Sequence, residues 1–182
     1  MIPVFSEVTS AEATTAAASA ETTSAEATPA GITGAPQRIV IDTNVCLDLF
    51  VFRDPRWAGL LAAIESGAVE AITRADCRDE YHIVLHYPHL PLDETTRPAS
   101  AARFDALIKV VAPPESGVRL PVCTDRDDQK FLELARDAGA DVLITKDKAL
   151  LKLARRLRNA GMFAVIPPEQ WALPARADAA LE

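Results

Sequence analysis

The sequence predicts an α/β protein with a mainly parallel central sheet that helices cover on both faces. Short apolar or β-branched runs alternate along the chain with longer segments of helical periodicity. Strands separated by helices are joined by crossovers and therefore lie parallel. The chain has 182 residues, of which 49% are hydrophobic. That is enough for one domain and a tail, but not for two large domains.

Residues 1–36 differ in composition from the rest. Ala, Thr, Ser and Glu fill 25 of these positions, which include four glutamates and no Lys or Arg. Such a segment buries too little apolar surface to offset its ordering entropy, and it lacks the basic and apolar regions of a secretory signal. We therefore expect a disordered acidic extension at 1–36, a folded domain at 37–173 and a C-terminal tail at 174–182.

The first half of the domain begins with a β-branched run at 38–42, which predicts a strand. Apolar residues at helical spacing follow over 44–52. Pro55 can open the next helix and Gly67 can end it. The elements expected after it are a strand at 69–73, a helix at 75–87 and a helix at 95–110.

The second half continues the alternation after a loop at 113–119. A helix at 127–138 is indicated by Phe131, Leu134 and Ala135, which share one face. Short apolar runs predict the remaining strands, and a mixed basic and apolar segment predicts the last helix. These elements are expected as strands at 120–123, 142–145 and 162–166 and a helix at 148–159.

Carboxylates follow three of the predicted strands. In parallel α/β folds, ligands gather beyond the C-terminal ends of the strands. The acids expected at this edge are Asp42 after the first strand, Asp125, Asp127 and Asp128 after the third, and Asp147 after the fourth. The helix at 75–87 adds Asp76, Asp79 and Glu80 if its N-terminal half faces this edge.

Crowded carboxylates repel one another and raise each other's pKa. A hard divalent cation such as Mg²⁺ or Mn²⁺, which prefers oxygen ligands, reverses this cost. The ordinary alternative for Asp42, Asp127 and Asp147 is a role as helix N-cap or first-turn acid. The coincidence of acids at three strand ends favours a metal site for phosphoryl chemistry.

Four segments carry a resemblance to a known family: IDTNV, CRDEYHIVL, TDRDDQKFLELA and GADVLITKDKALL. In this order and spacing the sequence resembles the PIN-domain nucleases, and most closely the branch of VapC-like ribonucleases, the toxins of toxin–antitoxin systems. The resemblance runs from about residue 38 to 171. It implies a three-layer α/β/α sandwich, bound Mg²⁺ or Mn²⁺, and hydrolysis of RNA phosphodiester bonds that leaves 5′-phosphate ends.

The resemblance also implies roles for particular residues. The matching acids, expected to be catalytic and to hold the metal, are Asp42, Glu80, Asp128 and Asp147. Asn44 and Thr145 match polar residues that orient the metal ligands or a water.

Three assignments stay open at the level of sequence. Asp125 competes with Asp128 as the third acid. Asp128 is preferred because it stands at a fixed distance before the buried face of its helix. Asp79 competes with Glu80 as the second acid. Asp48 is expected to point into solvent, although it could line the same cleft.

The segment 146–158 holds six basic residues and one acid. Lys152, Arg155 and Arg156 are candidates for binding RNA phosphates beside the acids, and the alternative is a solvated helix face. The net charge of −7 argues against a bulk electrostatic clamp on nucleic acid.

The function expected from the sequence is that of a Mg²⁺- or Mn²⁺-dependent endoribonuclease, the toxin of a toxin–antitoxin pair. An antitoxin and a second copy of the chain are possible partners beside RNA. No apolar run reaches the roughly 18 residues of a membrane helix, and three scattered cysteines fit the reducing cytoplasm. The alternative is a catalytically weak PIN-fold module that binds RNA. A haloacid-dehalogenase-type phosphatase is disfavoured because Asn44 replaces its second aspartate.

Overall fold

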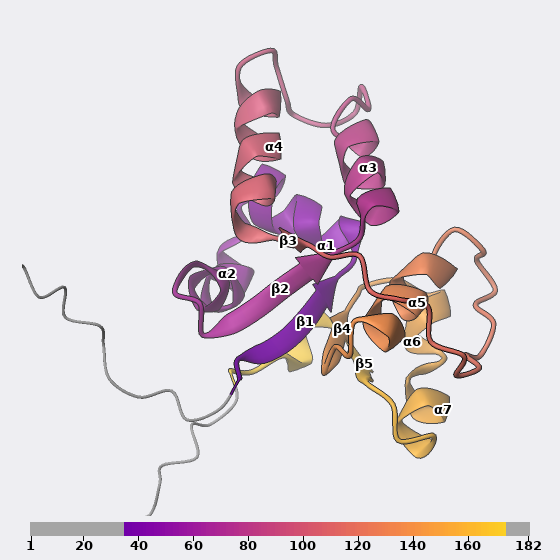
Figure 1. The fold of residues 1–182 in the computed structure, drawn as a ribbon. Helices are drawn as coiled ribbons and strands as arrows, with labels where there is room; N and C mark the ends of the chain where they lie inside the picture. Colours follow the sequence, from indigo (N-terminus) through magenta and orange to yellow (C-terminus); the bar gives the residue numbers. More distant parts are fainter. Residues whose placement is uncertain (1–34, 174–182) are drawn as a thin grey trace, which may run out of the picture. The chain divides into compact units, whose positions relative to one another are not determined.

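The computed structural model describes residues 35–173, which form a three-layer α/β/α sandwich (Figure 1). Its central sheet has five strands, all parallel, in the order β3-β2-β1-β4-β5. The expected fold class is therefore confirmed. The predicted extension at 1–36, except for its last two residues, and the predicted tail at 174–182 lie outside the described residues.

The sheet and its connections are continuous over the described part of the chain. The strands are β1 (Gln37–Ile41), β2 (Val69–Thr73), β3 (Lys109–Val110), β4 (Val142–Ile144) and β5 (Ala164–Ile166). The helices are α1 (Thr43–Leu47), α2 (Ala58–Glu65), α3 (Ala75–Val84), α4 (Thr96–Leu107), α5 (Gln129–Asp137), α6 (Lys148–Leu151) and α7 (Ala154–Asn159). A π-helical turn (Asp48–Phe52) continues α1, and single 3₁₀ turns span Pro55–Trp57 and Pro168–Gln170.

Each face of the sheet has its own hydrophobic core. Along β1, Ile39 and Ile41 point into the core under α1 to α4, whereas Val40 points into the core under α5 to α7. β4 alternates in the same way, with Ile144 on the first side and Leu143 on the second. This period of two is the pattern of strands buried on both faces, and it places the ends of β1 and β4 in the middle of the molecule.

The strand predicted at 120–123 is wrong. This segment is irregular, because Pro121 has no N–H to give to a ladder and the amide of Cys123 donates to the side chain of Gln129 instead (2.7 Å). The edge strand beside β2 is β3, which lies at the end of the segment predicted to be helical to residue 110. There Ile108 has already adopted extended dihedral angles.

The single helix predicted at 148–159 is two helices. The amide of Leu153 donates to the carbonyl of Leu150, only three residues earlier (2.9 Å), which tightens the backbone and ends α6. Buried Leu150 and Leu157 anchor the two pieces in the same core. Among residues 35–173, no helix is both long and apolar enough to cross a membrane.

Candidate active site

Asp42 and Thr145 lie side by side at the C-terminal ends of β1, the central strand, and β4, its neighbour. The Thr145 hydroxyl donates to Oδ2 of Asp42 (2.7 Å) and accepts from the backbone N–H of Asp147 (2.9 Å). Asp42 is 2% exposed and Thr145 is fully buried. One buried hydroxyl therefore joins the acids that follow two different strands.

Asp42 and Asp147 also cap the helices that follow them. Oδ1 of Asp42 accepts from the amide of Asn44 (3.4 Å), and Oδ1 of Asp147 accepts from the amides of Ala149 and Leu150 (2.6 and 3.2 Å). The capping interpretation raised from the sequence is thus correct for both residues. Within residues 35–173, Oδ2 of Asp147 has no hydrogen-bond partner, so capping leaves one of its oxygens available.

Glu80 comes to the site from α3, through contacts on two sides. Its Oε1 accepts from the hydroxyl of Thr43 (2.6 Å), the residue after Asp42. Its Oε2 is bound by the ammonium group of Lys130 in the first turn of α5. The side chains of Glu80 and Lys130 are only 30% and 21% exposed. The second acid is therefore held between α1 and α5.

Asp128 stands directly before α5 and does not cap it, since its side chain makes no capping bond. Burial raises the pKa of Asp128 to about 7, and the negative charges of Asp42, Asp147, Asp125 and Glu80 add to the effect. Such mutual repulsion requires that these carboxylates be near one another.

The pKa of Asp42 is also raised, first by burial and then by the charges of Glu80 and Asp147, against the opposing bond from Thr145. Negative charge at this edge is thus only partly compensated. Buried negative charge in proteins is usually paired with a cation. The negative potential at this edge of the sheet therefore favours binding of a cation.

A sequence model of the PIN domain matches residues 38–149. That span includes β1 to β4 and all four acids. The chain belongs to the PIN-domain family. PIN domains are generally nucleases, so the chain has a nuclease-type fold. Among curated proteins no match was found.

The four acids of this PIN domain have the chemistry of ligands for a divalent metal, but their side chains are not arranged around one point. Carboxylate oxygens are the ligands that Mg²⁺ and Mn²⁺ prefer. Among residues 35–173, however, no three His, Cys, Asp or Glu side chains are gathered closely enough to hold one ion. Glu80, with both its oxygens bound by Thr43 and Lys130, is the acid most clearly engaged elsewhere.

The structure distinguishes between several candidate site residues that the sequence did not. Asp79 points outward, with its side chain 69% exposed beside Arg78, whereas Glu80 accepts from the hydroxyl of Thr43, the residue after Asp42. Asp125 is exposed and closes a turn by accepting from the amide of Asp127 (3.0 Å). Asn44 is exposed at the start of α1, and only its backbone amide contacts Asp42.

The expectation that Asp48 points into solvent is wrong. Asp48 is 8% exposed, and its Oδ2 accepts from the indole of Trp57 (3.1 Å) and from the ammonium of Lys146 (2.6 Å). Lys146 follows Thr145 at the end of β4, so Asp48 serves to anchor this strand end. Its burial could not be read from helical spacing, because the π-helical turn changes the period.

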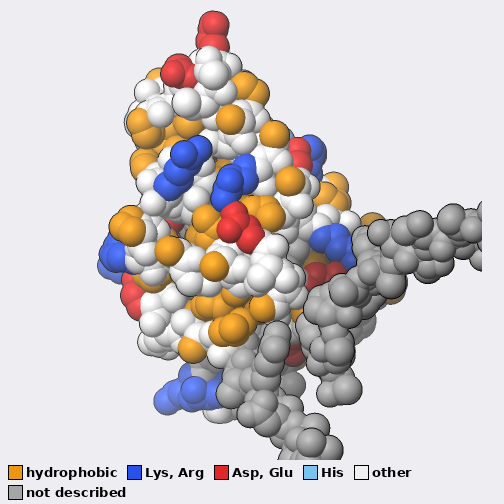
Figure 2. Space-filling model, turned by 90° about the vertical axis from the view of Figure 1, so that its left-hand side faces the viewer, with side chains coloured by type: hydrophobic (Ala, Val, Ile, Leu, Met, Phe, Trp, Pro, Cys, Tyr) orange, Lys and Arg blue, Asp and Glu red, His pale blue; other side chains and the backbone are white. Residues whose placement is uncertain are grey.

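Basic side chains follow the site along α6 and α7. Lys152, Arg155 and Arg156 are all exposed, and none forms an ion pair with another residue of the described range. The face seen in Figure 2, over α2 and α4, is different, since Lys and Arg side chains there are interspersed with acidic and hydrophobic ones.

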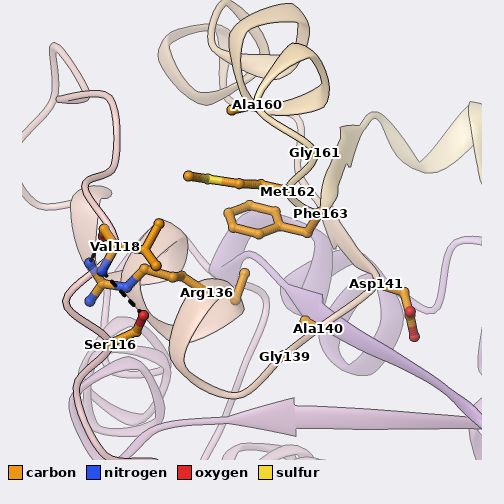
Figure 3. A pocket seen from close by; sticks show the side chains of 11 residues that line it. Ser116, Val118, Arg136, Gly139, Ala140, Asp141, Ala160, Gly161, Met162 and Phe163 are labelled. Atoms are coloured by element: carbon orange, nitrogen blue, oxygen red, sulfur yellow. Dashed lines mark hydrogen bonds between the residues drawn. The ribbon is translucent and has the colours of Figure 1, made fainter.

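The hollow in Figure 3 lies away from the acids, at the other ends of β4 and β5. It has a volume of about 530 Å³ and lies between Arg136 and Val118 on one side and Met162 and Phe163 on the other (Figure 3). None of the four acids lines it. The chemistry of the PIN domain is therefore to be sought at the acidic strand ends.

Two residues of the site were missed from the sequence. Thr43 lies within the IDTNV segment, between the predicted metal ligand Asp42 and the predicted orienting residue Asn44. Lys130, in the first turn of α5, carried no sequence prediction. The one signal for it is its position two residues after Asp128, as a lysine within an acidic stretch.

Proposed function

We propose that the protein is a metal-dependent ribonuclease, with Asp42, Glu80, Asp128 and Asp147 as the acids that hold Mg²⁺ or Mn²⁺. The observation that carries this proposal is the partly compensated negative charge of Asp42, at the end of the central strand β1, and of Asp128, directly before α5, whose pKa values are both raised. A bound metal supplies an activated water near neutral pH and neutralises charge on the attacked phosphate.

The chain's own polar groups set the geometry of those acids. Thr145 fixes the rotamer of Asp42 and ties it to the backbone of Asp147. Thr43 orients Glu80. Asn44 is exposed at the rim of the site and is proposed to orient a ligand or a water. Carboxylates held by such neighbours are preorganised, which is what metal sites require.

Lys152, Arg155 and Arg156 are proposed to bind RNA phosphates. They are exposed on and beside the two helices that follow Asp147, so a strand of RNA lying over these helices would reach the acids. Cationic side chains beside an acidic site offset the repulsion between the acids and the phosphates.

The biological setting proposed is that of a cytoplasmic toxin in a toxin–antitoxin pair. The antitoxin would block the acids, and a second copy of the chain is a further possible partner. The domain proposed to carry the activity is 37–173, with 1–36 and 174–182 as extensions. These assignments depend on the resemblance of the sequence to VapC-like ribonucleases.

The competing proposal is a PIN domain that binds RNA with little turnover. It is favoured by one observation, that no three metal-binding side chains are gathered within residues 35–173. Thermal unfolding in the presence of Mn²⁺ separates the two proposals. An intact site raises Tm with metal concentration, because a ligand that binds only the folded state stabilises it, whereas a decayed site leaves Tm unchanged.

The direct test of the ribonuclease is cleavage of a single-stranded RNA by the purified protein in Mn²⁺. We expect cleavage that EDTA stops and excess Mn²⁺ restores. Activity that persists in excess EDTA would rule out the metal mechanism. Binding of RNA without cleavage, in every divalent metal tried, would favour the binding module.

A further inference from the structure

The Glu80–Lys130 ion pair is an unusual contact for an acid of a metal site. It joins residues 50 positions apart, from α3 and α5, and both side chains are mostly buried. A surface lysine would lose little by remaining in water. This one is instead held over the ring of Phe131 (5.7 Å from its centroid) with its ammonium group on the carboxylate.

The pair also determines which oxygens of Glu80 are free. Oε1 is taken by the Thr43 hydroxyl and Oε2 by Lys130. A lysine ammonium and a divalent cation compete for the same carboxylate oxygen, because each requires its lone pairs. Both oxygens of Glu80 are therefore engaged, and within the described residues no three His, Cys, Asp or Glu side chains are gathered closely enough to hold one ion.

We propose that Lys130 is an internal counter-ion that occupies the metal's place at Glu80, so that a divalent cation must displace its ammonium group to gain this ligand. The inference depends on the proposed metal-dependent function. Lys130 is thus a positioning residue that acts through Glu80 and sets the metal concentration at which the site fills.

The charge balance of the site supports this role. Lys130 is the lysine or arginine that the structure places in direct contact with one of the four acids within residues 35–173. A PIN domain without metal must hold these acids in one place against their repulsion. One ammonium group relieves part of that repulsion, and a divalent cation that displaced it would take over this role at Glu80.

The test is calorimetric titration of Mn²⁺ into the full-length protein and its Lys130→Met variant. Removing the competitor should tighten metal binding by about tenfold, the scale of one hydrogen bond between charged groups. The matched control is Lys109→Met, which removes the same charge and also breaks a lysine–glutamate pair, with Glu70 (2.7 Å), elsewhere in the sheet. Its metal affinity should equal that of the wild type.

Glu80→Gln separates competition from simple electrostatics. If Lys130 acts through Glu80, then Lys130→Met in the Glu80→Gln background should change metal affinity by less than about twofold. An undiminished tenfold effect in that background would overturn the proposal in favour of long-range charge repulsion. Equal affinity of Lys130→Met and wild type would overturn it as well, while leaving the ribonuclease proposal intact.

A second measurement needs no substitution. In wild-type protein, the side-chain ammonium signal of Lys130 in an NMR spectrum should shift on addition of Mg²⁺ and then exchange faster with water. A Lys130 signal unchanged at saturating Mg²⁺ contradicts displacement. Failure of every variant and of the wild type to bind metal is a different result, since it removes the proposed metal-dependent function itself.

Discussion

The same sheet holds two groups of charged residues that differ in balance. On β1, β2 and β3, Glu70 is bound by both Arg38 and Lys109 (2.8 and 2.7 Å), and these bonds lower its pKa, the one from Lys109 most. In the acidic group, burial and neighbouring charges raise the pKa of Asp42, after β1, and of Asp128, before α5. The charge of Glu70 is neutralised by neighbouring basic side chains, whereas the charges of Asp42 and Asp128 are not fully neutralised by the residues around them.

The contrast distinguishes acids that stabilise the folded state from acids that we propose to have a function. An acid whose pKa is lowered contributes to folding in its charged form, whereas one whose pKa is raised costs stability at neutral pH. Proteins retain such costs mainly at functional sites. Variants of the two groups should therefore differ both in activity and in the sign of their effect on stability.

The largest expected effect is on RNA cleavage by Asp42→Asn. The amide keeps the shape of the side chain but removes the charge and one acceptor, so cleavage in Mn²⁺ should fall by at least about 100-fold, the upper end for losing even an outer partner of a metal site. The control is Glu70→Gln, from the balanced group, which should cleave RNA at the wild-type rate. Equal activity of Asp42→Asn and wild type would remove Asp42 from the mechanism.

Thr145→Val should reduce cleavage by about 10- to 100-fold. Valine has the same shape, but Asp42 then loses its donor and the amide of Asp147 loses its acceptor. Leaving buried polar groups unsatisfied costs about 1–3 kcal/mol each, which urea unfolding measures. Thr73→Val is the matched control, because the hydroxyl of this buried threonine makes one long bond, to the carbonyl of Arg74 (3.4 Å).

Stability should respond with opposite sign in the two groups. The pKa of Asp128 is raised to about 7 in the folded state, so its cost to stability is absent below the ordinary aspartate pKa, grows as pH rises from there, and is complete above pH 7. Without metal, Asp128→Asn should therefore raise Tm by about 2–4 °C at pH 8 and by progressively less toward pH 4.

Glu70→Gln should instead lower Tm at neutral pH. Its pKa is lowered in the folded state, so its stabilising charge is present above the ordinary glutamate pKa and is lost as pH falls through the folded value. Scanning both variants in EDTA across this pH range measures the contrast. Shifts of the same sign in both variants would show that the two groups are not electrostatically different.

The smallest effect concerns RNA affinity. Replacing Arg155 and Arg156 by alanine should weaken binding and reduce the slope of log affinity against log salt concentration by about 0.7 for each lost phosphate contact. Arg103 and Lys109, which pair with Glu65 and Glu70, provide a control double variant with the same charge change. A salt slope equal to that of wild type would show that Arg155 and Arg156 are solvent-exposed residues that do not contact RNA phosphates.

The sequence predicted the features that follow from local pattern and a general rule of topology. Parallel strands bring their C-terminal ends to one edge, which was enough to place Asp42 and Asp147 together. It could not predict the partner of Glu80, because the contact with Lys130 depends on how α3 packs against α5, across 50 residues.

Errors in the predicted elements have local causes. The two-residue strand β3 is too short to have a periodicity of its own. The more apolar segment 120–123 was predicted as a strand instead, but Pro121 prevents it from joining the sheet. Asp48 was expected in solvent because its burial depends on a π-helical turn and on the distant Trp57 and Lys146. Such contacts are set by tertiary structure and leave little trace in the spacing of residues.

The central position of β1 has a consequence for how the protein unfolds. Its side chains belong alternately to both cores, so neither layer of helices can detach without exposing the strand that directly precedes Asp42. Amide hydrogens of β1 and β4 should exchange with solvent only through global opening. A ligand that binds at Asp42 would then slow amide exchange equally on both sides of the sheet, because it stabilises the folded state against global opening.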